Sequence, residues 1–144
     1  MINKTIFFLH KGVFVPDSRS HIGLSHSIST AGKKLSVKAG EDLHIPLKVS
    51  NTGTARWLDE NINDIGVVKI GTHLYDEQNT LLDLDFSRHA INGPIEPGQT
   101  FEQDMVLRFS DVGKLAISVD LVAEGVCWFE GAGSRPLYLQ IHVI

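Results

Sequence analysis

Four residues that carry an aromatic or imidazole ring could lie on one binding surface. They are Trp57, His73, Tyr75 and Trp128. The rigid rings of tryptophan and tyrosine can stack on the apolar face of a sugar while neighbouring polar groups hold its hydroxyls. For the two tryptophans, covering the ends of a hydrophobic core is the favoured interpretation. We keep the four residues as a candidate ligand-binding set beside this structural interpretation.

Arg88 is predicted to need a carboxylate partner. It has the same strand parity as Leu84 and Phe86, so its guanidinium is expected to point inward near a strand end. Burying a charge without a partner is costly. We therefore predict a structural ion pair from Arg88 to Glu124, with Asp120 as the second candidate and ligand binding as the alternative role.

Residues that could support catalysis or bind a metal do not form a recognisable motif. The seven histidines lack the short paired spacing of metal ligands, so neither a metal nor another cofactor is expected. Asp83 and Asp85 share one strand face, but a solvated sheet surface explains them better than an acid–base pair does. Cys127 has no adjacent histidine or lysine to activate it. The sequence therefore predicts that the protein is not an enzyme.

Strands are the elements that must position these residues. From residue 35 onward apolar residues alternate with polar ones, and turn residues interrupt the pattern about every ten residues, which is typical of antiparallel β-structure. About seven short strands predict an all-β domain, an immunoglobulin-like antiparallel β-sandwich spanning 35–144. The clearest alternating runs are 43–49, 68–75, 82–87, 101–109, 115–121 and 137–143.

Residues 1–34 are less periodic and are predicted to be an N-terminal extension that is partly ordered or adds a strand. The apolar run 6–9 is followed at once by His10 and Lys11. That run is shorter than the core of a signal peptide and far shorter than a membrane span. We expect no membrane-spanning segment.

Composition narrows the class of protein further. The chain has 144 residues, of which 42% are hydrophobic and 21% charged, as in an ordinary single globular domain. Thirteen basic against 17 acidic residues give a net charge of −4, which offers no positive field to attract nucleic acid. A single cysteine excludes an internal disulfide. We expect a cytoplasmic protein that does not bind nucleic acid.

Several local motifs together point to a known module. Residues 120–129 read DLVAEGVCWF, and this stretch follows an Asn-Thr-Gly turn, a Gly-x-His-x-x-Asp strand and a Pro-Gly turn. Over about residues 35–144 the pattern resembles an immunoglobulin-like accessory module found in bacterial glycosyltransferases and related polysaccharide-synthesis proteins. The residues that carry the resemblance are Asn51, Gly53, Trp57, Gly71, His73, Leu74, Asp76, Arg88, Pro97, Gly98, Asp120, Glu124, Gly125, Trp128 and Phe129.

The resemblance implies a non-catalytic accessory role in bacterial polysaccharide biosynthesis. The expected partner is a polysaccharide or a glycosyltransferase-type catalytic domain, and glycan binding is the function it favours. The alternative is a protein-interaction module that docks on a catalytic domain. Such a module could also self-associate as a homo-oligomer, because an exposed sheet edge invites pairing with another strand.

Overall fold

The alternating segments form nine strands in the computed structural model, which describes residues 16–144. Two short 3₁₀ turns, η1 (Ile62–Asp64) and η2 (Phe129–Ala132), interrupt them. The strands are β1 (His26–Ser29), β2 (Lys34–Val37), β3 (Asp42–Asn51), β4 (Val68–Tyr75), β5 (Leu81–Ala90), β6 (Thr100–Arg108), β7 (Gly113–Ala123), β8 (Cys127–Trp128) and β9 (Leu137–Val143).

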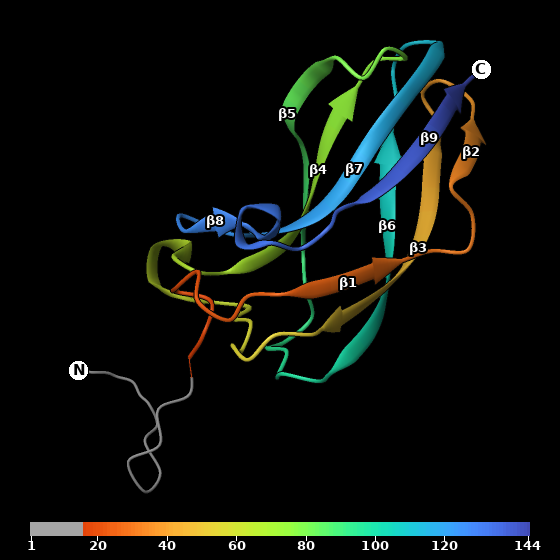
Figure 1. Cartoon of the computed structure of the whole chain (residues 1–144). Coiled ribbons are helices and arrows are strands. Elements are labelled where there is room, and N and C mark those ends of the chain that lie inside the picture. Colours follow the sequence, from red (N-terminus) through yellow and green to blue (C-terminus); the bar gives the residue numbers. More distant parts are fainter. Residues whose placement is uncertain (1–15) are drawn as a thin grey trace, which may run out of the picture.

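The strands are arranged in two sheets. The smaller sheet has the order β1-β3-β6, and the larger has the order β2-β9-β7-β4-β5, with the short β8 paired to β7. Figure 1 shows β9, β7 and β4 side by side in the larger sheet, with β2 at one edge and β5 at the other. All pairs are antiparallel except β2 with β9, which is parallel. The predicted β-sandwich is confirmed.

The core lies between the two sheets and follows the period of two that defines each strand. In β3 the side chains of Ile45 and Leu47 point inward and are buried, whereas the residues between them are exposed. In β9 the inward residues Leu139 and Ile141 meet them from the opposite layer, and Met105 of β6 completes this part of the core. The sheets therefore expose one face each, and binding residues must lie on an outer face or at an end.

The described part of the N-terminal extension belongs to the sandwich. Strand β1 lies within 1–34 and pairs with β3, and Leu24 is buried in the core. The predicted apolar run 6–9 lies outside the described residues. Within the described residues, no helix has the length and apolar character needed to cross a membrane.

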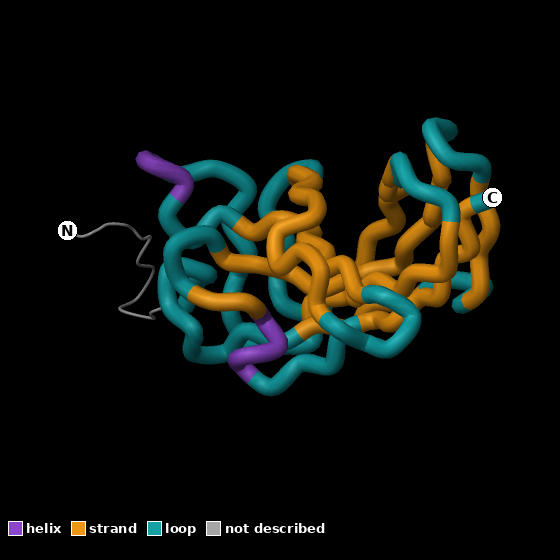
Figure 2. The backbone as a smooth tube through the Cα atoms, turned by 90° about the horizontal axis from the view of Figure 1, so that it is seen from above, coloured by secondary structure: helices purple, strands orange, loops and turns teal. Residues whose placement is uncertain are grey.

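The central strand β7 differs between its two ends. Its residues 117–123 are buried on both faces, whereas Lys114 is exposed and Ala116 half-buried. Figure 2 shows both 3₁₀ turns in the half of the molecule away from the C-terminus. One half of the outer face of the larger sheet is therefore covered, and the other half is open.

Candidate functional site

Three rows of outward-facing side chains run across the larger sheet. The first joins β4, β7 and β9, the second joins β4, β7, β9 and β2, and the third joins β7, β9 and β2. The register of the strands defines these rows, because residues opposite each other in neighbouring strands share a face. Their inward-facing neighbours, such as Ile117 and Leu139, are buried in the core. The rows are His73–Ser118–Tyr138, then Tyr75–Ala116–Gln140–Lys34, then Lys114–His142–Ser36.

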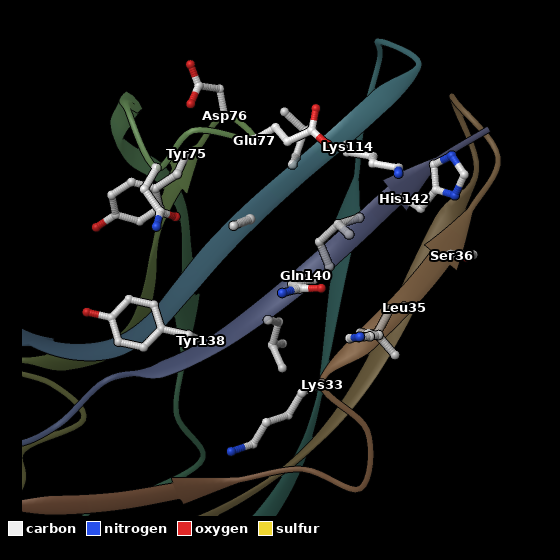
Figure 3. Close-up of a pocket in the computed structure, with 16 residues that line it drawn as sticks. Lys33, Leu35, Ser36, Tyr75, Asp76, Glu77, Lys114, Tyr138, Gln140 and His142 are labelled. Carbon is white, nitrogen blue, oxygen red and sulfur yellow. The ribbon is translucent and has the colours of Figure 1, made fainter.

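The open half of this face forms a groove with a volume of about 1080 Å³. Tyr75 contributes from β4, Ala116 from β7, and Tyr138 and Gln140 from β9. Figure 3 shows Tyr75 of β4 and Tyr138 of β9 toward the same end of the pocket, on opposite sides of β7, with Gln140 further along β9. This volume slightly exceeds the usual range for small-ligand pockets, about 300–1,000 Å³.

Small residues on the central strand leave room between the tyrosines. Ala116 lies directly opposite both Tyr75 and Gln140, so the second row has a small side chain in its middle and a larger side chain on each side. The Tyr75 hydroxyl lies 3.5 Å from the hydroxyl of Ser118, which is itself buried. The result is a trough along β7 with a tyrosine on either side.

Tyr138 presents its ring to solvent and keeps its proton. The side chain is 54% exposed although it stands on a strand whose inward residues form the core. Partial burial raises the pKa of the Tyr138 phenol, and the nearby Glu130, Tyr75 and Asp120 raise it further. Tyr138 therefore acts near neutral pH as an aromatic surface with a hydroxyl that can donate a hydrogen bond.

The other half of the outer face is covered by the segment that contains Trp128. A Cβ atom added at Gly71 would lie 2.6 Å from the Trp128 ring, so the indole rests directly on the backbone of β4. His73 packs against the same ring at a centroid distance of 4.2 Å, and the Arg88 guanidinium lies 4.6 Å from the ring centroid. Trp128 is thus engaged by the protein's own residues on the surface where a ligand would have to stack.

Arg88 pairs with Glu124 as predicted, but on the outer face of the sheet. Its Nε donates to Glu124 at 3.2 Å, and a second contact joins it to Asp85. The inward orientation predicted from Phe86 is wrong because the pairing of β5 with β4 shifts register, which changes the parity between Phe86 and Arg88. Arg88 therefore lies opposite Gly71 and over the Trp128 ring.

Asp120 is not a partner of Arg88, and this part of the prediction is wrong. Its carboxyl group is fully buried and lies 2.6 Å from Nε2 of His26, on the strand β1 of the other sheet. It also accepts hydrogen bonds from the backbone N–H groups of Leu121 and Glu130. Asp120 thereby joins β1, β7 and the start of η2 at the covered end.

Trp57 is a core residue, as its structural interpretation predicted, so its place in the ligand-binding set is wrong. The side chain is fully buried and meets the buried Phe129 ring edge to face at a centroid distance of 5.5 Å. Phe129 also stacks on His26 at 5.5 Å. A ring in this position can reach a ligand only if the covered end opens.

The four predicted ring residues therefore separate into two groups. Tyr75 lines the groove, whereas Trp57, His73 and Trp128 do not. His73 faces outward, but it is 5% exposed, and its Nδ1 donates to the carbonyl of Leu84. Trp57, His73 and Trp128 therefore belong to the covered end, and only Tyr75 belongs to the groove.

Sequence reasoning missed Tyr138, Gln140 and their neighbours on β9. The signal was present, because an apolar run at every second position of β9 places the intervening side chains on the outer face. Tyr138 is the outward aromatic of that run. What the pattern does not reveal is which segments cover the outer face, since that depends on how the β7–β9 connection folds back over the sheet.

Metal-binding and redox chemistry have little support in the described structure. Among residues 16–144, no group of three histidine, cysteine, aspartate or glutamate side chains is placed to hold a metal ion. The pKa of the Cys127 thiol is raised by burial and by the nearby Asp120, which disfavours the reactive thiolate.

Comparison with known proteins finds only distant similarities to this chain. Neither the search against protein families nor the search against curated proteins finds a match. Among solved structures the chain is similar to a β-glucosidase from Listeria innocua, with 14% identity and a TM-score of 0.46, over 83% of this chain and 16% of that one. The chain thus spans less than a fifth of the β-glucosidase.

Two further solved structures are similar over more of their own length. One is a PapD-like domain of human CEP192, with 15% identity and a TM-score of 0.40 over 99% of this chain and 98% of that chain. The other is the sporulation control protein Spo0M from Bacillus subtilis, with 10% identity and a TM-score of 0.42 over 85% and 50%. All of these likenesses are distant, so the function must be argued from the groove.

Proposed function

We propose that this protein is a non-catalytic accessory module of bacterial polysaccharide biosynthesis that binds a glycan chain in the groove beside β7. The observation that carries the proposal is the pair of tyrosines, Tyr75 and Tyr138, on either side of a floor that contains Ala116. An aromatic ring offers a flat apolar surface to the C–H face of a sugar. The small floor residue lets the chain settle between the two rings.

Polar groups near the tyrosines suit the hydroxyls of a sugar. Gln140 has both a donor and an acceptor and lies opposite Ala116 in the middle row. Ser36 and His142 add further hydrogen-bonding groups in the third row. The rows are two residues apart along the strands, so the three rows extend over about 13 Å, enough for a short stretch of an extended chain.

The groove lacks the pairings that hydrolysis or group transfer would use. Within residues 16–144, His142 has no hydrogen bond to a carboxylate or hydroxyl, and Asp76 accepts hydrogen bonds from two backbone N–H groups of its own turn. A nucleophile needs an activating base within hydrogen-bond reach. A binding module that holds a polymer beside a glycosyltransferase-type catalytic domain fits these residues better than an enzyme does.

A glycan array tests the proposal directly. The purified chain would be applied to an array of bacterial surface polysaccharides, with heat-denatured protein as the control. Reproducible binding to a defined polymer is the expected outcome. No binding across a broad array would contradict the proposal.

Two matched variants then locate the site. Tyr75→Ala combined with Tyr138→Ala removes both rings, and we expect affinity for the bound polymer to fall at least about fivefold, since aromatic contacts contribute about 0.5–1.5 kcal/mol each beyond their buried area. Ile62→Ala removes a side chain that is 82% exposed and outside the groove, and it should leave affinity unchanged. Equal loss in both variants would place the binding elsewhere.

A second candidate function, a protein-docking module, rests on strand β5. This strand forms one edge of the larger sheet, and Leu82 and Leu84 on it are exposed. A long edge with exposed apolar residues can accept a strand from another protein or from a second copy. Light scattering would then show a mass that rises with concentration, and Leu84→Lys would abolish the rise.

A further inference from the structure

The groove carries a charge opposite in sign to that of the whole chain. The formal net charge of the protein is −4. Lys33, Lys34 and Lys114 line the groove, and among the described residues only Asp76 and Glu77 contribute carboxylates to it. With histidine neutral, the lining has three positive and two negative side chains. A local excess of cations on an acidic protein points to a ligand with negative charge.

The groove lysines are not engaged by carboxylates of the protein. Within residues 16–144, Lys33, Lys34 and Lys114 form no salt bridge, whereas Lys69 at the covered end contacts both Asp64 and Glu124. The ammonium groups in the groove are therefore available to a ligand.

The two carboxylates in the groove offset the positive charge of the lysines only in part. One oxygen of the Asp76 carboxylate accepts the backbone N–H groups of Gln78 and Thr80 in the turn that follows β4. This leaves Glu77, which is exposed, as the lining carboxylate without such a structural role. Asp76 and Glu77 also follow β4, on the opposite side of the groove from the two lysines of the β2 segment.

The positive groups lie on the floor strand β7 and on the side of the groove formed by β9 and β2. Lys114 lies opposite His142, and Lys34 is the register partner of Gln140. Figure 3 shows Lys114 and His142 at one end of the pocket and Lys33 at the other, with Gln140 between them. A chain resting along β7 would thus have tyrosine rings near one end and positive charges along one flank.

From this arrangement we propose that the groove selects glycans that carry anionic groups, either the carboxylates of uronic acids or phosphate diesters. The inference rests on the proposed glycan-binding function and specifies the class of polymer. The tyrosine rings contact the sugar faces, and the lysine ammonium groups pair with the negative substituents. Lysine pairs with an anion as a point charge, so it accepts carboxylate and phosphate alike.

Matched polymers separate charge selection from sugar binding. Oligogalacturonate supplies carboxylates, a phosphomannan supplies phosphate diesters, and neutral mannan supplies neither. We expect at least one anionic polymer to bind at least tenfold more tightly than neutral mannan in calorimetric titrations at low salt. The preference should shrink at high salt, because the Debye length falls from about 30 Å at 0.01 M to about 3 Å at 1 M.

Charge-matched variants show whether the groove lysines are responsible. Lys34→Gln with Lys114→Gln removes two positive charges that face the groove, and affinity for the anionic polymer should fall about fivefold, as two partly solvated ion pairs would give. Lys38→Gln with Lys48→Gln removes the same charge at exposed positions outside the groove and should change affinity less than twofold. Melting curves confirm that both variants remain folded.

Each outcome decides a different question. Anionic preference that is lost in the groove variant and kept in its control supports the inference. Equal affinity for neutral and anionic polymers, insensitive to Lys34 and Lys114, overturns the inference and leaves glycan binding intact. An equal loss in both lysine variants overturns it too, because the attraction would then come from the whole surface. No binding to any polymer overturns the proposed function and the inference with it.

Discussion

The two ends of the outer face of the larger sheet are built on different principles. At the covered end, Gly71 and Asp120 are specialised to hold a neighbouring segment, since one makes room for the Trp128 ring and the other accepts three hydrogen bonds. At the open end, Tyr75 and Tyr138 leave space between them. The first arrangement fixes the shape of the fold, and the second leaves a surface free for a ligand.

This contrast changes what the sequence motifs mean. Four of the residues on which the expected resemblance to a polysaccharide-synthesis module rests, Gly71, His73, Asp120 and Trp128, lie at the covered end and contact one another or their neighbours. Tyr138 and Gln140 lie outside that pattern. These motif residues thus close one end of the sandwich, and, apart from Asp76, the residues that line the groove lie outside the motif.

The largest effect is expected when the buried carboxyl group at the covered end is removed. Asp120→Ala leaves His26 and two backbone N–H groups without their acceptor, and breaking a buried pair of this kind lowers the free energy of unfolding by about 3–5 kcal/mol. Chemical denaturation measures the loss.

Asp104→Ala is the matched control for this change. Asp104 also lies 2.6 Å from a histidine nitrogen, that of His44, but its side chain is 50% exposed. An exposed pair contributes at most about 1 kcal/mol. If both variants lost the same stability, the covered end would not be the rigid part of the molecule.

A smaller loss is expected from a single methyl group beneath the tryptophan. In Gly71→Ala the new Cβ would lie 2.6 Å from the Trp128 ring, so the indole must move away from His73 and Arg88. Overpacking of this kind typically costs about 1–3 kcal/mol. Thermal melting and the near-ultraviolet circular dichroism of tryptophan measure the two consequences.

The control for this variant is Gly131→Ala in η2. No atom lies within 4 Å of a Cβ at Gly131, and its backbone φ is outside the left-handed region. Its stability should therefore stay within about 0.5 kcal/mol of the parent. An unchanged melting temperature in Gly71→Ala would show that Trp128 is not held against β4.

The general architecture could be predicted from the sequence, because one physical cause fixes it. Apolar residues at every second position must face a core, and turn residues separate the strands, so the β-sandwich follows. The Arg88–Glu124 pair was predicted from the cost of an isolated buried charge, and it forms on the outer face, where both side chains are about one quarter exposed. Both arguments need only the pattern along the chain.

The site could be predicted only in part, because it depends on contacts between distant segments. The parity of Arg88 was misread because a shift in the β4–β5 register is not visible in the alternation. Trp57 and Trp128 were candidates because aromatic rings suit both cores and binding sites. Only the path of residues 124–136 over the sheet decides between these roles, and that path brings Phe129 against Trp57 and Trp128 against Gly71.

The open end should contribute little to stability. Tyr138→Ala removes a ring that is more than half exposed and that stacks on no other aromatic ring within residues 16–144, so the free energy of unfolding should change by no more than about 0.5 kcal/mol. Denaturation curves of the variant and the parent would overlay. A large loss would mean that Tyr138 is a structural residue like Trp57, and the contrast between the two ends would fail.

The smallest effect is a pH dependence that involves His89. Burial lowers the pKa of His89 below its ordinary value of 6.5. The unfolded chain then binds the proton more readily than the folded one, so stability is complete above pH 6.5 and declines as the pH falls through the pKa of the folded state. His89→Gln should remove this decline, as measured by denaturation at a series of pH values.

His44 supplies the opposite slope and so tests the assignment. The hydrogen bond to Asp104 raises the pKa of His44 above 6.5, and the negative charge of Asp104 raises it further. The contribution of His44 to the free energy of unfolding is therefore complete below pH 6.5 and disappears as the pH rises through the raised pKa. If His44→Gln rather than His89→Gln removed the decline on the acid side, burial would not be the cause of that decline. The half-buried histidine of β5 would then behave as a solvent-exposed one.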